Sequence, residues 1–411
     1  EKKYIFIILA IITAVVYLSG AGGFFFQHKD YHIRNALLND LTKFSFPVII
    51  DENIALVYYF GLLLVPVLAG KLFNSILVVD VFSFIWFWIG LFLVVLNLLI
   101  YTNSKKIQAV WAVLILLFFG STAPLFLDER LLYAKDFFIW HFPYLHMNNY
   151  INLCATSLVI IPIWILTILF LEYKDRVSYY GVISLFMLFY CPQILLGFSI
   201  FLIPFFICNI YKNCVWHEIF NIKNILSLIL MIPLILFFAS NYTSSTNGFF
   251  LKYVNVEYFK HCFYDYGLYF LLLLIPYRKN IFYWLSLLSL LLLPMICFST
   301  SYDFGIKAII PASFVLCILL IKFLLEEENR LKIIKYLLLY SLIFALASSV
   351  IYIGSSFSNF YILHIGKRNN LKTFQGDNYL GWQDSYEGDT KNYVSIDYKK
   401  YIFWKYIAKK F

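Results

Sequence analysis

Three groups of polar residues interrupt a chain that is otherwise strongly apolar. The first group follows the first apolar segment and contains Asp30, Arg34 and Asp40. Beside an apolar segment a carboxylate is poorly explained by packing, whereas it is well explained by proton transfer on a membrane-borne substrate. Asp30 and Arg34 are four residues apart, so on a helix they share one face. A simple Asp–Arg surface pair is the alternative explanation.

The second group occupies residues 127–148 and contains His141 and His146. Aromatic residues alternate with these histidines, and their rings would suit stacking against a sugar; they are Trp140, Phe142 and Tyr144. The charges of this group mostly balance, so a solvated loop is the alternative.

The third group is Asp303 and Lys307, where a long apolar segment begins. An ammonium at that position could grip a lipid phosphate, or it could snorkel toward water. Asp80 is a further acid within an apolar segment, where ionisable groups are costly and usually functional. Helix capping or contact with water would also explain it.

Composition places these groups in a membrane protein. Of the 411 residues, 62% are hydrophobic and 13% are charged, whereas soluble proteins carry about 25% charged residues. Apolar runs of about 20 residues recur along the chain, and each can cross a hydrocarbon core of about 30 Å. We therefore predict an all-α polytopic membrane protein. The net charge of +9 lies mostly on short loops, where it sets orientation and does not indicate nucleic-acid binding.

The charges of the loops predict the topology. Lys2 and Lys3 precede the first apolar segment, so the N-terminus is expected inside and residues 21–54 outside. If 55–73 crossed the membrane, Lys105 and its basic neighbour would fall outside. We therefore interpret 55–73 as an interfacial or re-entrant helix on the outer side.

With that choice the basic clusters of five later loops all become cytoplasmic, and the C-terminus lies outside. The prediction is a bundle of about 11 transmembrane helices, near 4–20, 75–101, 108–126, 149–172, 178–191, 192–210, 222–240, 262–277, 281–298, 307–324 and 333–353.

Two parts of unequal size follow from this topology. Residues 1–353 form a transmembrane module whose first external loop, 21–74, carries juxtamembrane helices. Residues 354–411 form a small extracytoplasmic tail that ends in a basic aromatic run at 398–405. That run is either an interfacial anchor or a contact for a substrate lipid.

The sequence contains no pattern that predicts a cofactor. Its seven cysteines lie in or beside apolar segments without a Cys-x-x-Cys pair, and are interpreted as core residues. Nucleotide-binding and zinc-protease motifs are absent from it. No metal is expected, because no clear ligand set for a divalent cation is evident.

Four motifs resemble one family across nearly the whole chain. They read Asp30…Arg34-Asn35-Ala36-Leu37-Leu38-Asn39-Asp40-Leu41 with Pro47-Val48, Tyr58-Tyr59-Phe60-Gly61…Pro66-Val67-Leu68-Ala69-Gly70-Lys71, Pro192…Gly197…Pro204-Phe205, and Asp303-Phe304-Gly305-Ile306-Lys307-Ala308-Ile309-Ile310-Pro311-Ala312. This set resembles bacterial multispan glycosyltransferases of the GT-C superfamily, distant relatives of the protein O-mannosyltransferases. The resemblance also implies that the segment after the first loop is a juxtamembrane helix.

The resemblance implies an inverting glycosyltransferase of the bacterial cytoplasmic membrane with an extracytoplasmic active site. A sugar on a polyprenyl phosphate would be the donor, and a glycan, lipid or protein the acceptor. Asp30 would be the general base, and Lys307 with Arg34 would offset charge on the departing phosphate. The donor or acceptor would also contact His141 or His146, together with Asp40, Tyr58 and Asp303.

Two departures from the family pattern bear on the chemistry. Relatives typically carry Arg where this chain has Lys307, so a bidentate phosphate contact is replaced by a point charge. Asp30 also lacks the adjacent acid that members of the superfamily often have, since Asp40 is ten residues on.

Two other classes of protein remain as alternatives. A transporter or flippase of lipid-linked sugars would need a polar pathway through the bilayer centre, and the predicted spans offer very few ionisable groups there. A polysaccharide polymerase or ligase usually has a large late external loop rich in Arg and His, and the loop 299–306 is too short for that.

Overall fold

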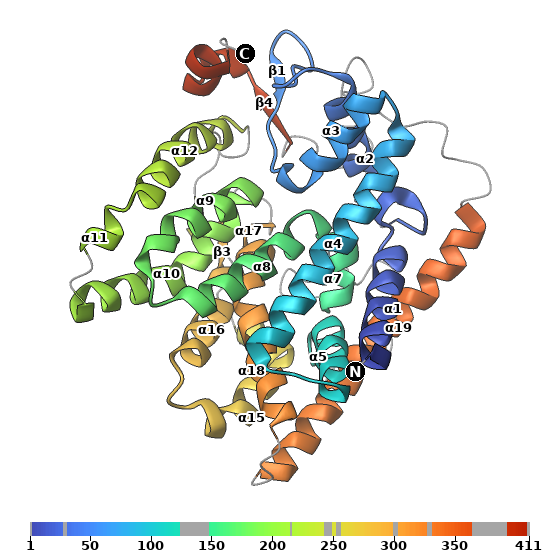
Figure 1. Cartoon of the computed structure of the whole chain (residues 1–411), viewed down its shortest axis with the longest axis vertical. Helices are drawn as coiled ribbons and strands as arrows, with labels where there is room; N and C mark the ends of the chain where they lie inside the picture. Colours follow the sequence, from blue (N-terminus) through green and yellow to red (C-terminus); the bar gives the residue numbers. More distant parts are fainter. Residues whose placement is uncertain are drawn as a thin grey trace.

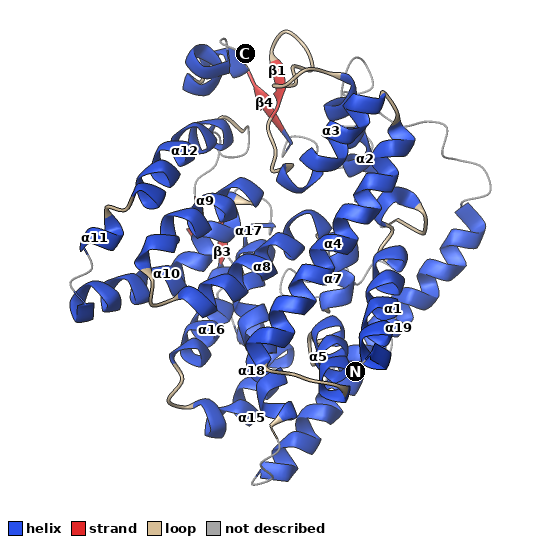
Figure 2. Cartoon of the chain, viewed as in Figure 1, coloured by secondary structure: helices blue, strands red, loops and turns tan. Residues whose placement is uncertain are grey.

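Apolar helices form most of the described chain (Figure 2). The computed structural model describes residues 2–27, 31–123, 148–213, 216–241, 249–251, 256–298, 303–326, 331–363 and 393–408. The helices are α1 (Lys2–Leu18), α2 (Tyr31–Lys43), α3 (Leu64–Phe73), α4 (Ile76–Thr102), α5 (Ile107–Phe118), α7 (Asn149–Ala155), α8 (Ser157–Tyr173), α9 (Tyr180–Tyr190), α10 (Pro192–Asn213), α11 (Trp216–Ile219), α12 (Ile222–Ala239), α14 (Val256–Cys262), α15 (Leu268–Tyr277), α16 (Ile281–Leu292), α17 (Asp303–Ala308), α18 (Ile310–Leu325) and α19 (Lys332–Leu363).

Within the described residues, five helical stretches are long and apolar enough to cross a membrane. They are Ile76–Thr102, Pro192–Tyr211, Ile222–Ala239, Phe304–Leu325 and Lys332–Ser358. Several shorter apolar helices pack among them. The chain is therefore a helical, multi-pass membrane protein, as its composition predicts. The count of about 11 spans stays a prediction.

Burial separates the centre of the bundle from its lipid-facing periphery. In the most apolar window of the stretch that contains α18, 83% of the residues are buried, against 11% for α12. Large apolar side chains such as Leu228, Leu230 and Ile232 are exposed along α12. Because an apolar helix cannot face water over most of its surface, α12 faces lipid. It lies at the edge of the molecule in Figure 1.

The two ends of the bundle differ in what they carry. Helices α2 and α3 lie at the top in Figure 1, whereas the α4–α5 and α15–α16 connections lie toward the lower end. Those connections contain the basic pairs Lys105–Lys106 and Arg278–Lys279. These two helices of the loop 21–74, which is predicted to be external, thus lie away from the two loops predicted to be cytoplasmic.

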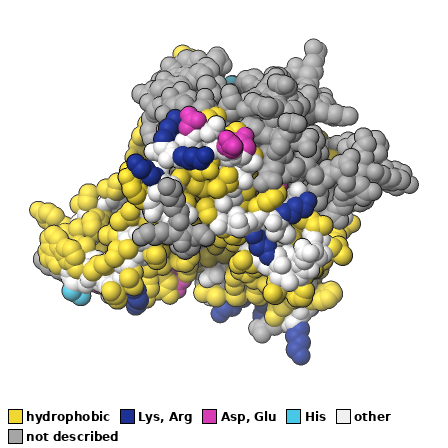
Figure 3. All heavy atoms as spheres, turned by 90° about the horizontal axis from the view of Figure 1, so that it is seen from above, with side chains coloured by type: hydrophobic (Ala, Val, Ile, Leu, Met, Phe, Trp, Pro, Cys, Tyr) yellow, Lys and Arg dark blue, Asp and Glu magenta, His cyan; other side chains and the backbone are white. Residues whose placement is uncertain are grey.

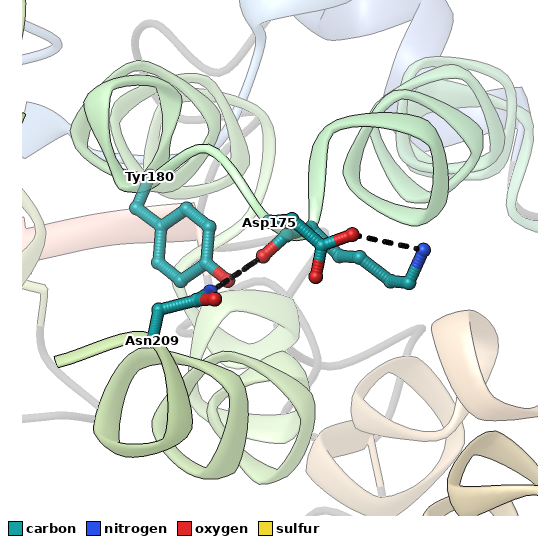
Figure 4. Close-up of polar contacts among 4 residues, drawn as sticks. Asp175, Tyr180 and Asn209 are labelled. Carbon is teal, nitrogen blue, oxygen red and sulfur yellow. Dashed lines mark hydrogen bonds and ion pairs between the residues drawn. The ribbon is translucent and has the colours of Figure 1, made fainter. Parts of the chain in front are cut away.

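A polar network fastens three helices near the lower connections. The side-chain amide of Asn209 donates to the carbonyl oxygen of Lys174 at 2.8 Å, and the hydroxyl of Tyr180 donates to the same oxygen. Lys174 also pairs with Asp175 at 3.4 Å (Figure 4). The network satisfies a carbonyl at the end of α8 that has no partner within its helix, and it joins α8, α9 and α10.

Two short antiparallel strand pairs accompany the helices, which the all-α prediction did not include. Strand β1 (Ile54–Leu56) pairs with β4 (Val394–Ile396), and β2 (Phe249–Leu251) pairs with β3 (Ile296–Phe298). The first pair brings the C-terminal part of the chain onto the first external loop at the top of Figure 1.

Several predicted spans differ from the helices in length. Helix α5 ends at Phe118 although a span to 126 was expected. Gly120 approaches α7 so closely that an added Cβ would lie 2.6 Å from Asn148 Cα, and Phe119 accepts a hydrogen bond from the Asn149 amide at 2.8 Å. These contacts stabilise the non-helical backbone inside the protein, where such backbone is tolerated.

Other corrections concern helix ends. Helix α16 ends at Leu292, and strand β3 follows within the segment expected to be helical to 298. The span expected over 149–172 divides into α7 and α8 at Thr156. Helix α19 continues to Leu363, ten residues beyond the predicted end, and the hydroxyls of Ser355 and Ser356 donate to the carbonyl oxygen of Tyr352 in the preceding turn.

Candidate functional site

Lys307 is buried in the bundle, with 6% of its surface exposed. It lies in the last turn of α17, and its Nζ is 4.8 Å from the centre of the Tyr59 ring. The lysine therefore does not snorkel to water, and that explanation is wrong. A cation over an aromatic face is stabilised by the ring quadrupole, more strongly where water is excluded.

A glycine in α10 sets the position of α17. A Cβ at Gly197 would lie 2.2 Å from the carbonyl oxygen of Ala308, which is closer than any real contact. Only glycine therefore allows α10 to touch the backbone that carries Lys307. The glycine belongs to one of the four motifs, and this contact is a physical reason for it.

Two tyrosines link Lys307 to the first external loop. Tyr58 and Tyr59 follow β1; their ring centres are 3.8 Å apart, and the Tyr58 hydroxyl donates to the Tyr59 hydroxyl. The Tyr58 ring also stacks on Tyr393 at 4.1 Å, just before β4. The pairing of β1 with β4 thus positions the aromatic residues next to the lysine.

An apolar cavity of about 300 Å³ adjoins this aromatic pair. Tyr58 lines it together with residues of the first external loop, α9, α12 and the C-terminal segment, including Phe46, Phe189, Phe237 and Phe403. The cavity lies beside the lipid-facing helix α12. A hydrocarbon chain that entered it from the bilayer would exchange one apolar environment for another without exposure to water.

Arg34 is buried in α2 and points to a different neighbour. Its guanidinium donates to the carbonyl oxygen of Cys154 at 3.4 Å and lies 4.9 Å from the centre of the Tyr31 ring. Asp40, on the same helix, is completely buried. Helix α2 therefore turns Arg34 and Asp40 into the protein, while the predicted pairing of Arg34 with Asp30 stays a prediction, since Asp30 lies outside the described residues.

Asp265 is a buried acid that the sequence analysis missed. It lies in a short π-helix, Phe263–Gly267, and is 1% exposed. The Ser121 hydroxyl donates to its carboxylate, and the Thr122 amide donates to its backbone carbonyl at 3.2 Å. A π-helical turn often marks a functional position. The signal available was an acid inside a predicted span, the same signal that drew attention to Asp80.

Lys71 is another cation of the segment 21–74, outside the predicted spans. Its Nζ lies 4.7 Å from the centre of the Phe46 ring and donates to the carbonyl oxygen of Phe44. Partial burial lowers the pKa of Lys71 from its ordinary value, because desolvation disfavours the charged form. The contact fastens α3 to the loop that lines the cavity.

The predicted site residues are thus described to different extents. Tyr58 and Lys307 are brought together through Tyr59, whereas Arg34 contacts α7. Asp303 begins α17, and its side chain lies outside what the structure describes. Three further predicted residues also lie outside the described residues, namely Asp30, His141 and His146.

The described part of the chain also bears on metal binding. Within it, no three His, Cys, Asp or Glu side chains are grouped so that they could hold a metal ion. Comparison of the sequence and structure with protein-family models, curated proteins and solved structures finds no match.

Proposed function

We propose that the chain is an inverting glycosyltransferase that moves a sugar from a polyprenyl-phosphate carrier to an acceptor on the outer face of the membrane. The observation that carries the proposal is the buried ammonium of Lys307 beside an aromatic pair, Tyr58 and Tyr59, that borders an apolar cavity. A lipid phosphate needs a cation for its headgroup and an apolar surface for its chain. Both lie here within one connected group of residues.

The proposed architecture is a GT-C-like bundle of about 11 spans with external juxtamembrane helices and a small external tail. Helix α3 supports this arrangement. It has ten residues and a length of about 15 Å, about half of what the hydrocarbon core requires. If α3 does not cross the membrane, Lys105–Lys106, Arg278–Lys279 and the other basic clusters of the later loops share the cytoplasmic side.

In the proposed reaction Asp30 is the general base. It precedes α2 directly in the sequence and removes the proton of an acceptor hydroxyl while that oxygen attacks the anomeric carbon of the donor. The bond between the anomeric carbon and the phosphate oxygen breaks, and its electron pair leaves with the carrier phosphate. Attack and departure on opposite faces invert the anomeric centre. A positioned base contributes about 10²- to 10⁴-fold.

Lys307 binds the phosphate in this scheme and offsets the charge that develops on it as the sugar leaves. The low polarity around a buried ammonium strengthens that interaction relative to water. Arg34 supplies a second cation on α2, four residues after Asp30 in the sequence. His141 and His146, with Asp40 and Asp303, are assigned to orienting the donor or acceptor.

Binding of the carrier can be measured without knowing the sugar. The purified full chain in mild detergent would be titrated with a polyprenyl phosphate or the polyprenyl alcohol of equal length, and bound lipid counted by native mass spectrometry. We expect the phosphate to bind more tightly, and Lys307→Gln to weaken its binding at least about tenfold, as loss of one charge-assisted contact would.

Lys322 provides a matched control at the other end of α18. Its Nζ lies 3.9 Å from the centre of the Tyr101 ring, so it is also a lysine over an aromatic face. Lys322→Gln is expected to leave phosphate binding unchanged. Equal binding of phosphate and alcohol, or equal losses in the two variants, would refute the assignment of Lys307.

A further inference from the structure

The C-terminal segment Asp397–Ala408 has a buried side and an exposed side. Its buried side is aromatic: Trp404 is 4% exposed, and its ring centre is 5.0 Å from that of Tyr398. The Trp404 indole donates to the hydroxyl of Ser240 at 3.0 Å. The segment is therefore fastened to the protein and is not a free tail.

That fastening also fixes the depth of the segment in the membrane. Ser240 caps α12, the helix whose surface faces lipid along most of its length. Phe403 packs on Phe237 in the last turn of α12, with ring centres 5.1 Å apart. The segment thus lies where an apolar, lipid-facing helix ends, which is the level of the lipid headgroups.

The exposed side combines positive charge with apolar side chains. Lys399, Lys400 and Lys405 are exposed, while Ile402 and Tyr406 are 57% and 59% exposed. Ile402 and Tyr406 are four residues apart and share a face on a helical turn. Within the segment, Asp397 is the one acid, and it pairs with Lys400 at 3.2 Å. Figure 3, which views the molecule from above, shows Lys and Arg side chains on this face together with Asp and Glu side chains, and apolar surface around them.

We propose that this segment binds the anionic phospholipid headgroups of the surrounding bilayer. The three lysines would meet lipid phosphates, while Ile402 and Tyr406 enter the boundary between headgroups and acyl chains. Such a combination of basic and apolar side chains in one short segment is typical of interfacial anchors. The inference concerns bulk lipid and does not depend on the proposed transfer reaction.

A fluorescent probe at the exposed side can test the proposal. An environment-sensitive fluorophore would be attached to Tyr406→Cys in a Cys208→Ser background, since Cys208 is exposed, and that background alone would serve as the labelling blank. The full chain would be placed in nanodiscs of phosphatidylcholine with increasing phosphatidylglycerol. We expect a blue shift that develops with the phosphatidylglycerol fraction and weakens at high salt.

Two triple variants separate this surface from the rest of the protein. Lys399→Gln/Lys400→Gln/Lys405→Gln should reduce the shift to well under half of its parent value at the phosphatidylglycerol fraction that gives the parent its half-maximal shift, since each lysine at an anionic surface contributes about fivefold in affinity. The control variant Lys105→Gln/Lys106→Gln/Lys279→Gln removes the same number of charges at the opposite end of the molecule. It should leave the blue shift unaltered.

Three outcomes would overturn the proposal. The first is an emission in phosphatidylcholine alone that is identical to the emission with phosphatidylglycerol present. The second is a blue shift that persists in the C-terminal triple variant. In the third, polyprenyl phosphate produces the shift and phosphatidylglycerol does not, which would assign the surface to the substrate lipid. Failure of carrier binding at Lys307 would not affect any of these measurements.

Discussion

A lysine at the outer end of a membrane helix ordinarily extends toward water, whereas Lys307 is turned into the protein. Its position in the sequence is equally compatible with both directions of the side chain. The direction depends on Tyr59, which comes from a loop far away in the sequence and offers an aromatic face. Burying an ammonium is costly unless its surroundings or a ligand compensate. The aromatic face of Tyr59 supplies part of that compensation.

Replacement of the proposed base tests the reaction at the level of one atom. Asp30→Asn removes the proton acceptor with little change in size, so we expect transfer to fall at least about 100-fold. Reconstituted protein and a lipid-linked sugar donor would be used to measure turnover. Asp51→Asn is the control in the same segment 21–74: the Asp51 carboxylate accepts hydrogen bonds from the amides of Asn53 and Ile54, and an amide oxygen can still accept them. Near-normal turnover by Asp30→Asn would remove Asp30 from the catalytic role.

Asp265 should matter for stability through its acceptor oxygens. Asp265→Ala leaves the buried Ser121 hydroxyl without its carboxylate partner, which we expect to lower the free energy of unfolding by about 1–3 kcal/mol. Asp265→Asn retains an acceptor and should cost less. Thermal unfolding in detergent would measure both variants. A greater loss in the Asn variant than in the Ala variant would show that the acceptor is not what stabilises the site.

The roles that the sequence assigns to the site residues stay predictions, although the structure brings two of these residues close together. The motif residues Tyr58 and Lys307 do meet around one tyrosine. Asp265 was missed because its setting depends on a π-helical turn and on a non-helical segment after α5. Neither feature has a periodic signal in the sequence, since both arise from contacts between helices.

Among the contacts between elements, the one between α10 and α17 positions a proposed site residue, Lys307. Gly197→Ala would force a Cβ against the backbone of Ala308, so we expect a loss of about 1–3 kcal/mol in stability and weaker carrier binding through displacement of Lys307. Thermal unfolding and the lipid titration would measure the two effects.

Gly354→Ala is the matched control for that substitution. A Cβ at Gly354 meets nothing within 4 Å, and alanine favours a helix interior over glycine by up to about 1 kcal/mol. We expect Gly354→Ala to be neutral or mildly stabilising. If Gly197→Ala behaved in the same way, the glycine would not be what positions α17.

The boundaries of the helices show which features of the fold the sequence predicts and which it does not. The boundary predicted between the spans 178–191 and 192–210 agrees with the break between α9 and α10. The early end of α5 was not predicted, because an apolar run reads the same whether it is helical or extended. Its end is decided by Gly120 and the start of α7, which are distant in sequence from each other.

For the molecule as a whole, the orientation in the membrane is the most accessible test. Lys43 and Lys279 are both exposed, the first in the external loop and the second in the α15–α16 connection. In intact cells carrying the Cys208→Ser background, a membrane-impermeant maleimide should label Lys43→Cys and not Lys279→Cys. After permeabilisation both should react. Labelling of position 279 alone in intact cells would reverse the topology and with it the proposed location of the site.

The membrane class was predictable from the sequence, because apolar runs of about 20 residues that recur along a chain are typical of membrane-spanning helices. The short strand pairs were not, because three-residue strands have too few positions for an alternating pattern. Each strand is defined by the hydrogen bonds to its partner strand, which comes from a distant part of the sequence.

The pairing of β1 with β4 joins opposite ends of the sequence, and this has a consequence for biosynthesis. Phe403 and Ala408 form part of the cavity wall, so that wall cannot close while the ribosome is still translating the preceding helices. Newly made molecules can therefore retain a hydrocarbon chain in this cavity only once residues 393–408 have been synthesised, however early the preceding helices insert.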